Sequence, residues 1–385
     1  MKLLQAALVK VGPFDKIVLP FADDHGEARP VTVIHGAGGV GKSSVLTAIA
    51  NTRPGHCVVM PSRADAGARD TTSLPLVACD WALGPDAPER PHPLSVASPN
   101  ARSIPGDETE ALRRREQALF DRLAGEGGYA FLSIPSTRWF SRQPIALGAP
   151  ARTVARYDVR ATAGGDDATR SDLARETKQA LAYAAIAAAL PSVFSADKPA
   201  VHRFDLLGQA MHAAVDTLLQ LVGARYRGLD PLSFEPMFLM RSVGASEVPF
   251  DALPTRVRHL VSFAALPVRT LWAAYPDQDP RESEGVIAID DVDLHQDTQV
   301  EQRLIPALRA ALPEAQWILT TASPAVAGSA DASAVLALRV LDQDEADQGE
   351  QNGQNGIDAQ NPLNAPSDSS TQRVRVFAGD HARTH

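Results

Sequence analysis

Residues 36–43 read GAGGVGKS, and this short glycine-rich stretch decides the fold. It fits the pattern G-x-x-x-x-G-K-[ST] of a phosphate-binding loop. The apolar run 31–34 precedes it and a helix-forming run, 44–50, follows, so the loop lies between an expected strand and an expected helix. That context separates a phosphate loop from a glycine-rich turn that binds nothing. The stretch therefore predicts a nucleotide-binding site in an α/β fold.

The chemistry of such a loop assigns a role to each residue. Glycines let backbone N–H groups converge on phosphate oxygens, and the helix N-terminus adds a partial positive charge. Lys42, also a predicted catalytic residue, is expected to reach the β- and γ-phosphates, and the Ser43 hydroxyl to bind Mg²⁺. The predicted ligands of the nucleotide, which we expect to be ATP, are Gly36, Ala37, Gly38, Gly39, Val40, Gly41, Lys42, Ser43 and Ser44.

A second motif, GVIAIDD at residues 285–291, has the form of the acidic strand that phosphate-loop ATPases need. Its apolar residues predict a buried strand, with an acid at the strand end facing Mg²⁺. We predict that Asp290 binds the metal and that Asp291 orients or deprotonates the attacking water. The alternative is that both aspartates only cap the following helix. A further apolar run, 317–321, predicts a buried strand whose threonines end beside the nucleotide.

Composition excludes several other classes of protein. The net charge is −9, and the last 45 residues hold eight acids but only three bases. A mildly acidic body does not indicate a nucleic-acid groove, so DNA contact is unsupported by charge. No apolar run reaches the length of a membrane span. Two cysteines, Cys57 and Cys79, are too few for a disulfide framework and are typical of a reducing cytoplasm.

The order of the motifs predicts a split domain. We expect a P-loop ATPase head formed by residues 1–60 and 245–342, interrupted by a mostly helical insertion with irregular segments, 61–244. Residues 343–385 are rich in Gln, Asn, Gly, Asp and Ser and predict a polar, acidic, disordered tail. Within the tail, 373–377 is expected to be a last strand or a docking segment. Helices are expected over residues 108–123, 171–190 and 204–222.

Four stretches stand in the order and spacing of a known group: MKLLQAALVKVGPFDKIVLPF at the start, GAGGVGKSS, GVIAIDDVDLHQD and WILTTASP. In these stretches the chain resembles soluble ABC-type ATPase heads, above all the RecF/SMC-like and OLD-like AAA ATPases of bacterial DNA repair and phage defence. The resemblance implies an ABC-type head with a mixed β lobe and a parallel core sheet. It also implies a role for the turn 12–14, and groups His295 with the acidic pair.

Three departures from the group concern hydrolysis. Asp291 stands where the group has a glutamate, and Ala322 replaces its switch histidine. The signature segment corresponds to residues 253–260, which lack the serine and glycine that contact the γ-phosphate across the dimer. Arg256 or Arg258 could supply a cation to the other subunit instead, as an arginine finger does. The alternative is that this segment only packs.

Two further groups of residues carry weaker signals. Arginines at 113–115 share an expected helix with several acids, which favours a solvated face over a phosphate-binding one. Arg138 and Trp139 follow an expected strand over 129–134 and could line a nucleotide or partner surface, or serve the structure alone. The polar tail leaves no room for the metal-dependent nuclease domain that OLD-like proteins carry, so we expect that domain to be absent.

These features support one hypothesis and one alternative. The hypothesis is a cytoplasmic, ATP-binding and slowly hydrolysing switch subunit that forms a homodimer through its ATP sites. It would control a separate effector protein in DNA repair or antiviral defence, as the resemblance implies. The alternative is a non-hydrolysing scaffold that keeps its nucleotide as a structural ligand.

Overall fold

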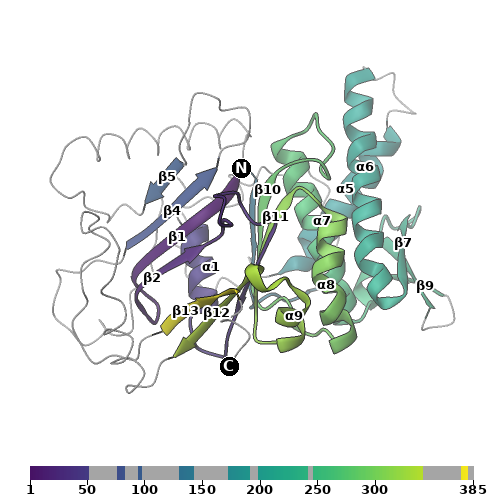
Figure 1. The fold of residues 1–385 in the computed structure, drawn as a ribbon. Coiled ribbons are helices and arrows are strands. Elements are labelled where there is room, and N and C mark those ends of the chain that lie inside the picture. Colours follow the sequence, from purple (N-terminus) through teal and green to yellow (C-terminus); the bar gives the residue numbers. More distant parts are fainter. Residues whose placement is uncertain are drawn as a thin grey trace, which may run out of the picture. The chain divides into compact units, whose positions relative to one another are not determined.

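The computed structural model divides the chain into two compact units (Figure 1). Unit 1 comprises Met1–Lys2 and Leu123–Ala330, and unit 2 comprises Leu3–Arg122 and Asp331–His385. The residues that the structure describes are 1–51, 76–82, 94–97, 130–142, 172–190, 198–241, 246–340 and 374–379. The expected helix over 108–123 and nearly all of the expected tail lie outside these ranges. The boundaries expected at residues 60 and 245 stay a prediction.

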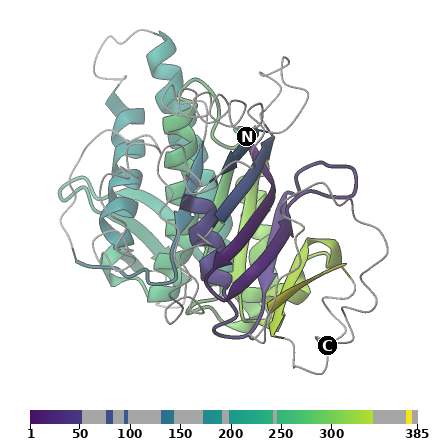
Figure 2. The same cartoon turned by 90° about the vertical axis from the view of Figure 1, so that its left-hand side faces the viewer.

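Unit 2 contains a four-stranded sheet in the order β2-β1-β4-β5 (Figure 2). Strands β1 (Lys2–Val11) and β2 (Phe14–Pro20) form an antiparallel hairpin in which Leu8 lies opposite Ile17. Strand β4 (Leu76–Ala82) pairs antiparallel with β5 (Leu94–Ala97). Alternate residues of β4 are buried, as expected for a strand with one face on a core.

The phosphate loop of unit 2 lies between a strand and a helix. Strand β3 (Val31–His35) pairs in parallel with β12 (Val335–Val340), which follows the short turn η6 (Ala332–Ala334). Helix α1 (Lys42–Asn51) begins within the loop. These elements confirm the strand, loop and helix expected from the sequence. Strand β13 (Val374–Ala378) pairs antiparallel with β12, so the segment expected as a last strand is one.

Unit 1 contains three parallel strands, β6 (Phe131–Ile134), β10 (Gly285–Ile289) and β11 (Ala315–Thr321). Every residue of β10 and β11 is buried, which is typical of parallel strands covered on both faces. Three helices of this unit follow or precede these strands: α7 (Thr255–Ala274), α8 (Thr298–Ala311) and α9 (Pro324–Ser329).

Two long helices complete the helical layer of unit 1 (Figure 1): α5 (Leu173–Ala189) and α6 (Lys198–Leu219). Both confirm expected helices, but α6 begins six residues before the expected start at 204. Pro199 lies in its first turn, where a missing backbone N–H is tolerated, so the proline does not delay the helix. Gly208 lets α6 approach α5, because a Cβ there would lie 3.0 Å from that of Ala188.

A small antiparallel sheet follows α6 and its terminal turn η3 (Gln220–Val222). It consists of β7 (Ala224–Leu229), β8 (Pro236–Met240) and β9 (Ser246–Pro249), and the turn η5 (Phe250–Ala252) leads from it to α7. The interval 61–244 thus holds strands β4 to β8 as well as two long helices. Within the described residues, no helix combines the length and the apolar character that crossing a bilayer requires.

Candidate functional site

The phosphate loop, in unit 2, is the first of two candidate functional regions. The Lys42 ammonium donates hydrogen bonds to the carbonyl oxygens of Gly36 (2.7 Å) and Ala37 (2.9 Å), and only 7% of the residue is exposed. These bonds fold the lysine back over its own loop. Charged donors of this kind are the ones that phosphate oxygens attract most strongly.

Two loop glycines are required by close packing. A Cβ on Gly41 would lie 2.6 Å from the Phe14 ring and equally close to Pro13, and the φ of Gly41 is +98°. A Cβ on Gly36 would lie 2.6 Å from the carbonyl oxygen of Leu338. The turn 12–14 therefore supports the phosphate loop directly, which gives a physical role to the turn that the sequence resemblance singled out.

The outer side of the loop is open. Ala37, Gly38, Gly39 and Ser43 are exposed, and the first turn of α1 contains no acidic residue. The positive end of this helix is therefore not neutralised by its own side chains. Ser43 presents a hydroxyl oxygen, a donor that suits the hard Mg²⁺ ion.

The acidic pair directly after β10, in unit 1, is the second candidate functional region. Asp290 is buried, and its Oδ1 accepts a hydrogen bond from the Thr320 hydroxyl (2.6 Å). The Asp291 N–H donates to the same hydroxyl oxygen (2.7 Å). Thr320 is the next-to-last residue of β11, so this strand lies beside the acidic pair; the expected position of its threonines beside the nucleotide stays a prediction. A carboxylate held in this way fits an oxygen ligand of Mg²⁺.

Neither aspartate caps the following helix, so the alternative weighed from the sequence is wrong. The N-cap of α8 is Asp297, whose side chain accepts from the Val300 N–H (3.0 Å). Instead, the backbone turns sharply after β10: Asp291 has a φ of +44° and His295 a φ of +65°. Left-handed backbone is uncommon outside glycine and costs about 1–3 kcal/mol, so surrounding contacts have to hold it.

Arg138 provides those contacts. One guanidinium nitrogen donates to the carbonyl oxygens of Asp290 (2.5 Å) and Pro135 (3.0 Å), and the other donates to that of Asp291 (2.7 Å). The residue is 5% exposed, and its guanidinium carbon lies 5.2 Å from the centre of the Phe263 ring. Arg138 and Thr320 thus hold the acidic pair from two sides, and we call them the Arg138 clamp.

The electrostatics of Arg138 reflect its burial. Loss of hydration lowers the pKa of Arg138 from 12.5 to about 10, and the nearby Asp290, Asp291 and Asp293 partly oppose this shift. The side chain therefore remains charged at neutral pH. Of the two roles weighed from the sequence, the structural one describes these contacts.

Two stacked histidines connect the turn after the acidic pair to α7. The ring of His259, in the first turns of α7, lies 5.3 Å from that of His295 and 6.0 Å from that of Phe263. Burial lowers the pKa of His259 from 6.5 to about 3, and the charges of Arg138 and His295 add to this effect. His259 is therefore neutral at physiological pH. His295 follows Asp291 by four residues and contacts α7 through this stack; its expected grouping with the acidic pair stays a prediction.

The signature-like segment begins α7. Pro254 is its N-cap and has no side-chain group that could cap the helix. Residues 253–260 also lack the serine and glycine that the ABC-type resemblance leads one to expect. Arg256 forms an ion pair with Asp297, and Gln296 donates to the Arg256 carbonyl oxygen (3.3 Å). Arg258 donates to the Thr255 hydroxyl (3.1 Å) and lies over the Phe140 ring. Both arginines therefore have partners within their own chain.

The position of the missing histidine lies directly after β11. Ala322 stands there, and Ser323 caps α9 by accepting from the Ala325 N–H (3.1 Å). Ser323 also donates to Glu301 (2.8 Å), which fixes this turn against α8. Nothing in this turn supplies an imidazole. Within unit 1 the structure brings together Arg138, Asp290, Asp291 and Thr320, and within unit 2 it brings together the phosphate loop and the turn 12–14.

Comparison with solved structures identifies the fold. The chain is similar to an SMC head solved in complex with the C-winged helix domain of ScpA, with a TM-score of 0.51, 14% identity, and coverage of 90% of this chain and all of that one. Two further heads match over about nine tenths of this chain: one from Thermotoga maritima (TM-score 0.43, 16% identity, 96% of that chain) and one from Pyrococcus furiosus, bound to a C-terminal domain of ScpA (0.45, 15%, 98%). No protein-family model and no curated protein matches the sequence. The chain has the ABC-type ATPase fold of an SMC head, as the sequence predicted.

Proposed function

We propose that this chain is an ATP-binding switch subunit that forms a homodimer around nucleotide, hydrolyses it slowly and controls a separate effector protein. The observation that carries the proposal is the presence in one chain of a phosphate loop supported by the turn 12–14 and an acidic pair held by the Arg138 clamp, in an SMC-head fold. Either motif alone would support only nucleotide binding.

In this proposal the phosphate loop, residues 36–44, binds ATP, and Lys42 draws the β- and γ-phosphates to it. Ser43 and Asp290 hold Mg²⁺, which would neutralise charge on the phosphate oxygens when bound. Asp291 orients the attacking water and accepts its proton. Its carboxylate is one methylene shorter than the usual glutamate, and Ala322 offers no imidazole, so we expect slow turnover.

The proposal places the start of α7 against the nucleotide of the partner copy. ATP would then join two heads, and loss of the γ-phosphate would release them. The effector is a separate protein, as the solved SMC head is bound to a domain of ScpA. A role in DNA repair or phage defence rests on the sequence resemblance, and a cytoplasmic location on that resemblance and on the low cysteine content of the chain.

Steady-state ATP hydrolysis by the purified chain tests the proposal. We expect turnover that requires Mg²⁺ and is lost in Asp291→Ala, with Glu314→Ala, an exposed carboxylate before β11, as the matched control. A sizing column run with and without ATP and Mg²⁺ should show a dimer only with both. If ATP leaves the oligomeric state unchanged, the dimer switch is wrong.

One alternative is favoured by particular residues. Ala322, Asp291 and the Pro254 start of α7 are each compatible with a scaffold that binds nucleotide without hydrolysing it. Under that alternative, Lys42→Ala abolishes partner binding and Asp291→Ala changes nothing. Tight ATP binding without turnover, in the presence of the effector, would decide for the scaffold.

A further inference from the structure

The loop that joins β7 to β8, residues 230–235, carries an unusual pair of exposed side chains. Leu232 is 92% exposed and Phe234 is 50% exposed, the two highest values among large hydrophobic side chains in the described part of the chain. Single exposed apolar residues are ordinary on protein surfaces. Two within a six-residue loop need a reason.

The loop has a fixed shape. One Asp230 carboxylate oxygen accepts from the N–H groups of Leu232 (2.8 Å) and Ser233 (2.9 Å). The loop is closed by two backbone bonds, from the Asp230 N–H to the Glu235 carbonyl (2.9 Å) and from the Phe234 N–H to the Asp230 carbonyl (2.8 Å). These bonds hold Phe234 at a φ of +58°, a strained conformation for a bulky residue.

Such strain is most often stored where function requires it. Because Phe234 is 50% exposed, its side chain recovers only part of its burial energy in the free chain. A loop that is already ordered, however, loses little conformational freedom when it binds, which strengthens binding. Loop 230–235 therefore has the properties of a preorganised binding element.

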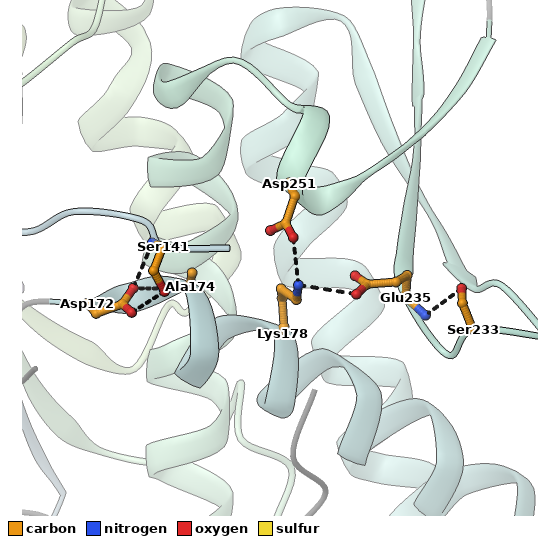
Figure 3. Close-up of polar contacts among 7 residues, drawn as sticks. All are labelled: Ser141, Asp172, Ala174, Lys178, Ser233, Glu235 and Asp251. Carbon is orange, nitrogen blue, oxygen red and sulfur yellow. Dashed lines mark hydrogen bonds and ion pairs between the residues drawn. The ribbon is translucent and has the colours of Figure 1, made fainter. Parts of the chain in front are cut away.

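The base of the loop is anchored in the interior of unit 1 (Figure 3). The Lys178 ammonium on α5, whose side chain is 1% exposed, forms ion pairs with Glu235 (3.2 Å) and Asp251 (2.9 Å). Glu235 ends the loop, and its N–H donates to Ser233 (3.3 Å). Asp251 lies in η5, three residues before the N-cap of α7. Lys178 thus joins the loop to the segment that leads into α7.

Besides these ion pairs, a series of contacts between aromatic rings connects β8 to α7. Ring centres are 6.3 Å apart between Phe238 and Phe250, 6.0 Å between Phe250 and Phe140, and 5.0 Å between Phe140 and His259. Phe238 lies on β8 and His259 on α7. The hairpin that carries the loop is therefore packed, through contiguous side chains, against the start of α7.

The chemistry of the loop selects among possible occupants. Asp230 is partly exposed, and hydrogen bonds from the Ser233 and Leu232 backbone lower its pKa, so it is ionised at neutral pH. An anionic lipid surface would repel this carboxylate and has no need of a strained, fixed loop. A symmetric contact between two copies would place one Asp230 near the other, which like charges disfavour.

We propose that loop 230–235 is the docking site for a different protein, which offers an apolar pocket for Leu232 and Phe234 bordered by lysine or arginine side chains that face Asp230. This inference rests on the proposed function, because the docked protein is the effector that the switch controls. Docking at the loop acts on α7 through Glu235, Lys178 and Asp251.

The test uses the full chain with a photo-crosslinking amino acid at position 232, in the cells that naturally carry it. The crosslinked protein is then purified, and its affinity for the chain is measured by calorimetry. We expect Leu232→Ser/Phe234→Asn to weaken binding at least tenfold, since Asn tolerates the left-handed conformation and keeps the loop shape. Val18→Ser, at an exposed valine of β2, is the matched control and should bind normally.

Three results would overturn the docking site: equal affinity of the double variant and Val18→Ser, a crosslink only to a second copy or to no protein, or phosphatidylglycerol vesicle binding that the double variant loses. ATP-dependent dimerisation of the double variant, measured without partner, should equal that of the natural chain. If the natural chain itself fails to dimerise with ATP, the proposed function fails while the affinity result still decides the docking site.

Discussion

Replacement of Arg138 by methionine tests how much the acidic pair depends on a buried cation. The guanidinium makes three hydrogen bonds to carbonyl oxygens, and bonds from charged donors contribute about 1.5–3 kcal/mol each. Against this, the fall in the pKa of Arg138 from 12.5 to about 10 corresponds to about 3 kcal/mol for keeping the charge buried. The difference predicts a loss of about 2–6 kcal/mol of unfolding free energy.

The functional expectation is more specific than the loss of stability. Without the Arg138 guanidinium, Asp291 can leave its left-handed conformation, so turnover should fall at least tenfold. ATP affinity should change less than threefold, because the phosphate loop belongs to unit 2. Arg138→Lys should recover little, because one ammonium cannot reproduce the paired donors of a guanidinium.

Thermal unfolding and steady-state kinetics would be measured beside Arg303→Met, an exposed arginine of α8. A domain of this size loses about 2–4 °C in melting temperature per kcal/mol, so the shift should be about 4–24 °C. If Arg138→Met melts and hydrolyses ATP as Arg303→Met does, the clamp has no role in holding the acidic pair.

Three other changes, two in the phosphate loop and one on α7, have expected outcomes that can be measured separately. Gly41→Ala should lower the unfolding free energy, measured by urea titration, by about 2–5 kcal/mol and abolish ATP binding, because its Cβ would meet Phe14 and the φ of Gly41 is left-handed. Gly38→Ala, whose Cβ would meet nothing within 4 Å, should leave the unfolding free energy unchanged in the same titration. Lys42→Ala should weaken ATP binding about a hundredfold by calorimetry, since the ammonium that would donate charge-assisted bonds to the phosphate oxygens is lost; unchanged affinity would exclude a phosphate role. His259 has a folded pKa of about 3, below the unfolded 6.5, so the unfolded chain binds more protons at acid pH and stability falls from pH 6.5 towards 3. The loss at pH 5 should be about 2 kcal/mol in urea unfolding and absent in His259→Phe; equal losses would contradict the depressed pKa.

The parts of the fold that the sequence predicted are those with local signals. Residues 31–50 combine an apolar run, a glycine pattern and a helix-forming run, and β3 and α1 form there. The strand 285–289 is continuously apolar, and β10 is fully buried. In each case, neighbouring residues contain the information, so no knowledge of distant contacts is needed.

The Arg138 clamp had no such signal. Arg138 lies more than 150 positions before Asp290, and its partners are backbone carbonyls, which leave no trace in the identities of the residues that offer them. Its role depends on β6 pairing with β10, which no local pattern near residue 138 specifies. The capping role of Asp297, by contrast, could have been predicted and was missed, because an aspartate directly before a helix-forming run is a strong N-cap signal.

The hairpin sheet could also have been found. Residues 224–227 alternate Ala, Arg, Tyr and Arg, and the structure buries the first and third while exposing the second and fourth. This period of two predicts a strand. We interpreted the interval as largely helical because the helix-forming runs around it are longer, and the long α6 ends only five residues before β7.

The contacts of unit 1 indicate where hydrolysis would be controlled. The turn after the acidic pair contacts the start of α7 twice, through the Arg256–Asp297 ion pair and the stacked His259 and His295. The ion pair is nearly half exposed on both sides, and exposed pairs contribute only about 0–1 kcal/mol. The Arg138 clamp is buried and several times stronger. A second head approaching α7 could therefore displace Arg256 from Asp297 and move the turn, while the clamp keeps Asp290 and Asp291 in place. Control of hydrolysis would then change how far the Asp291 carboxylate extends, through a movement of the turn that follows Asp291. The preceding strand, β10, would stay unchanged.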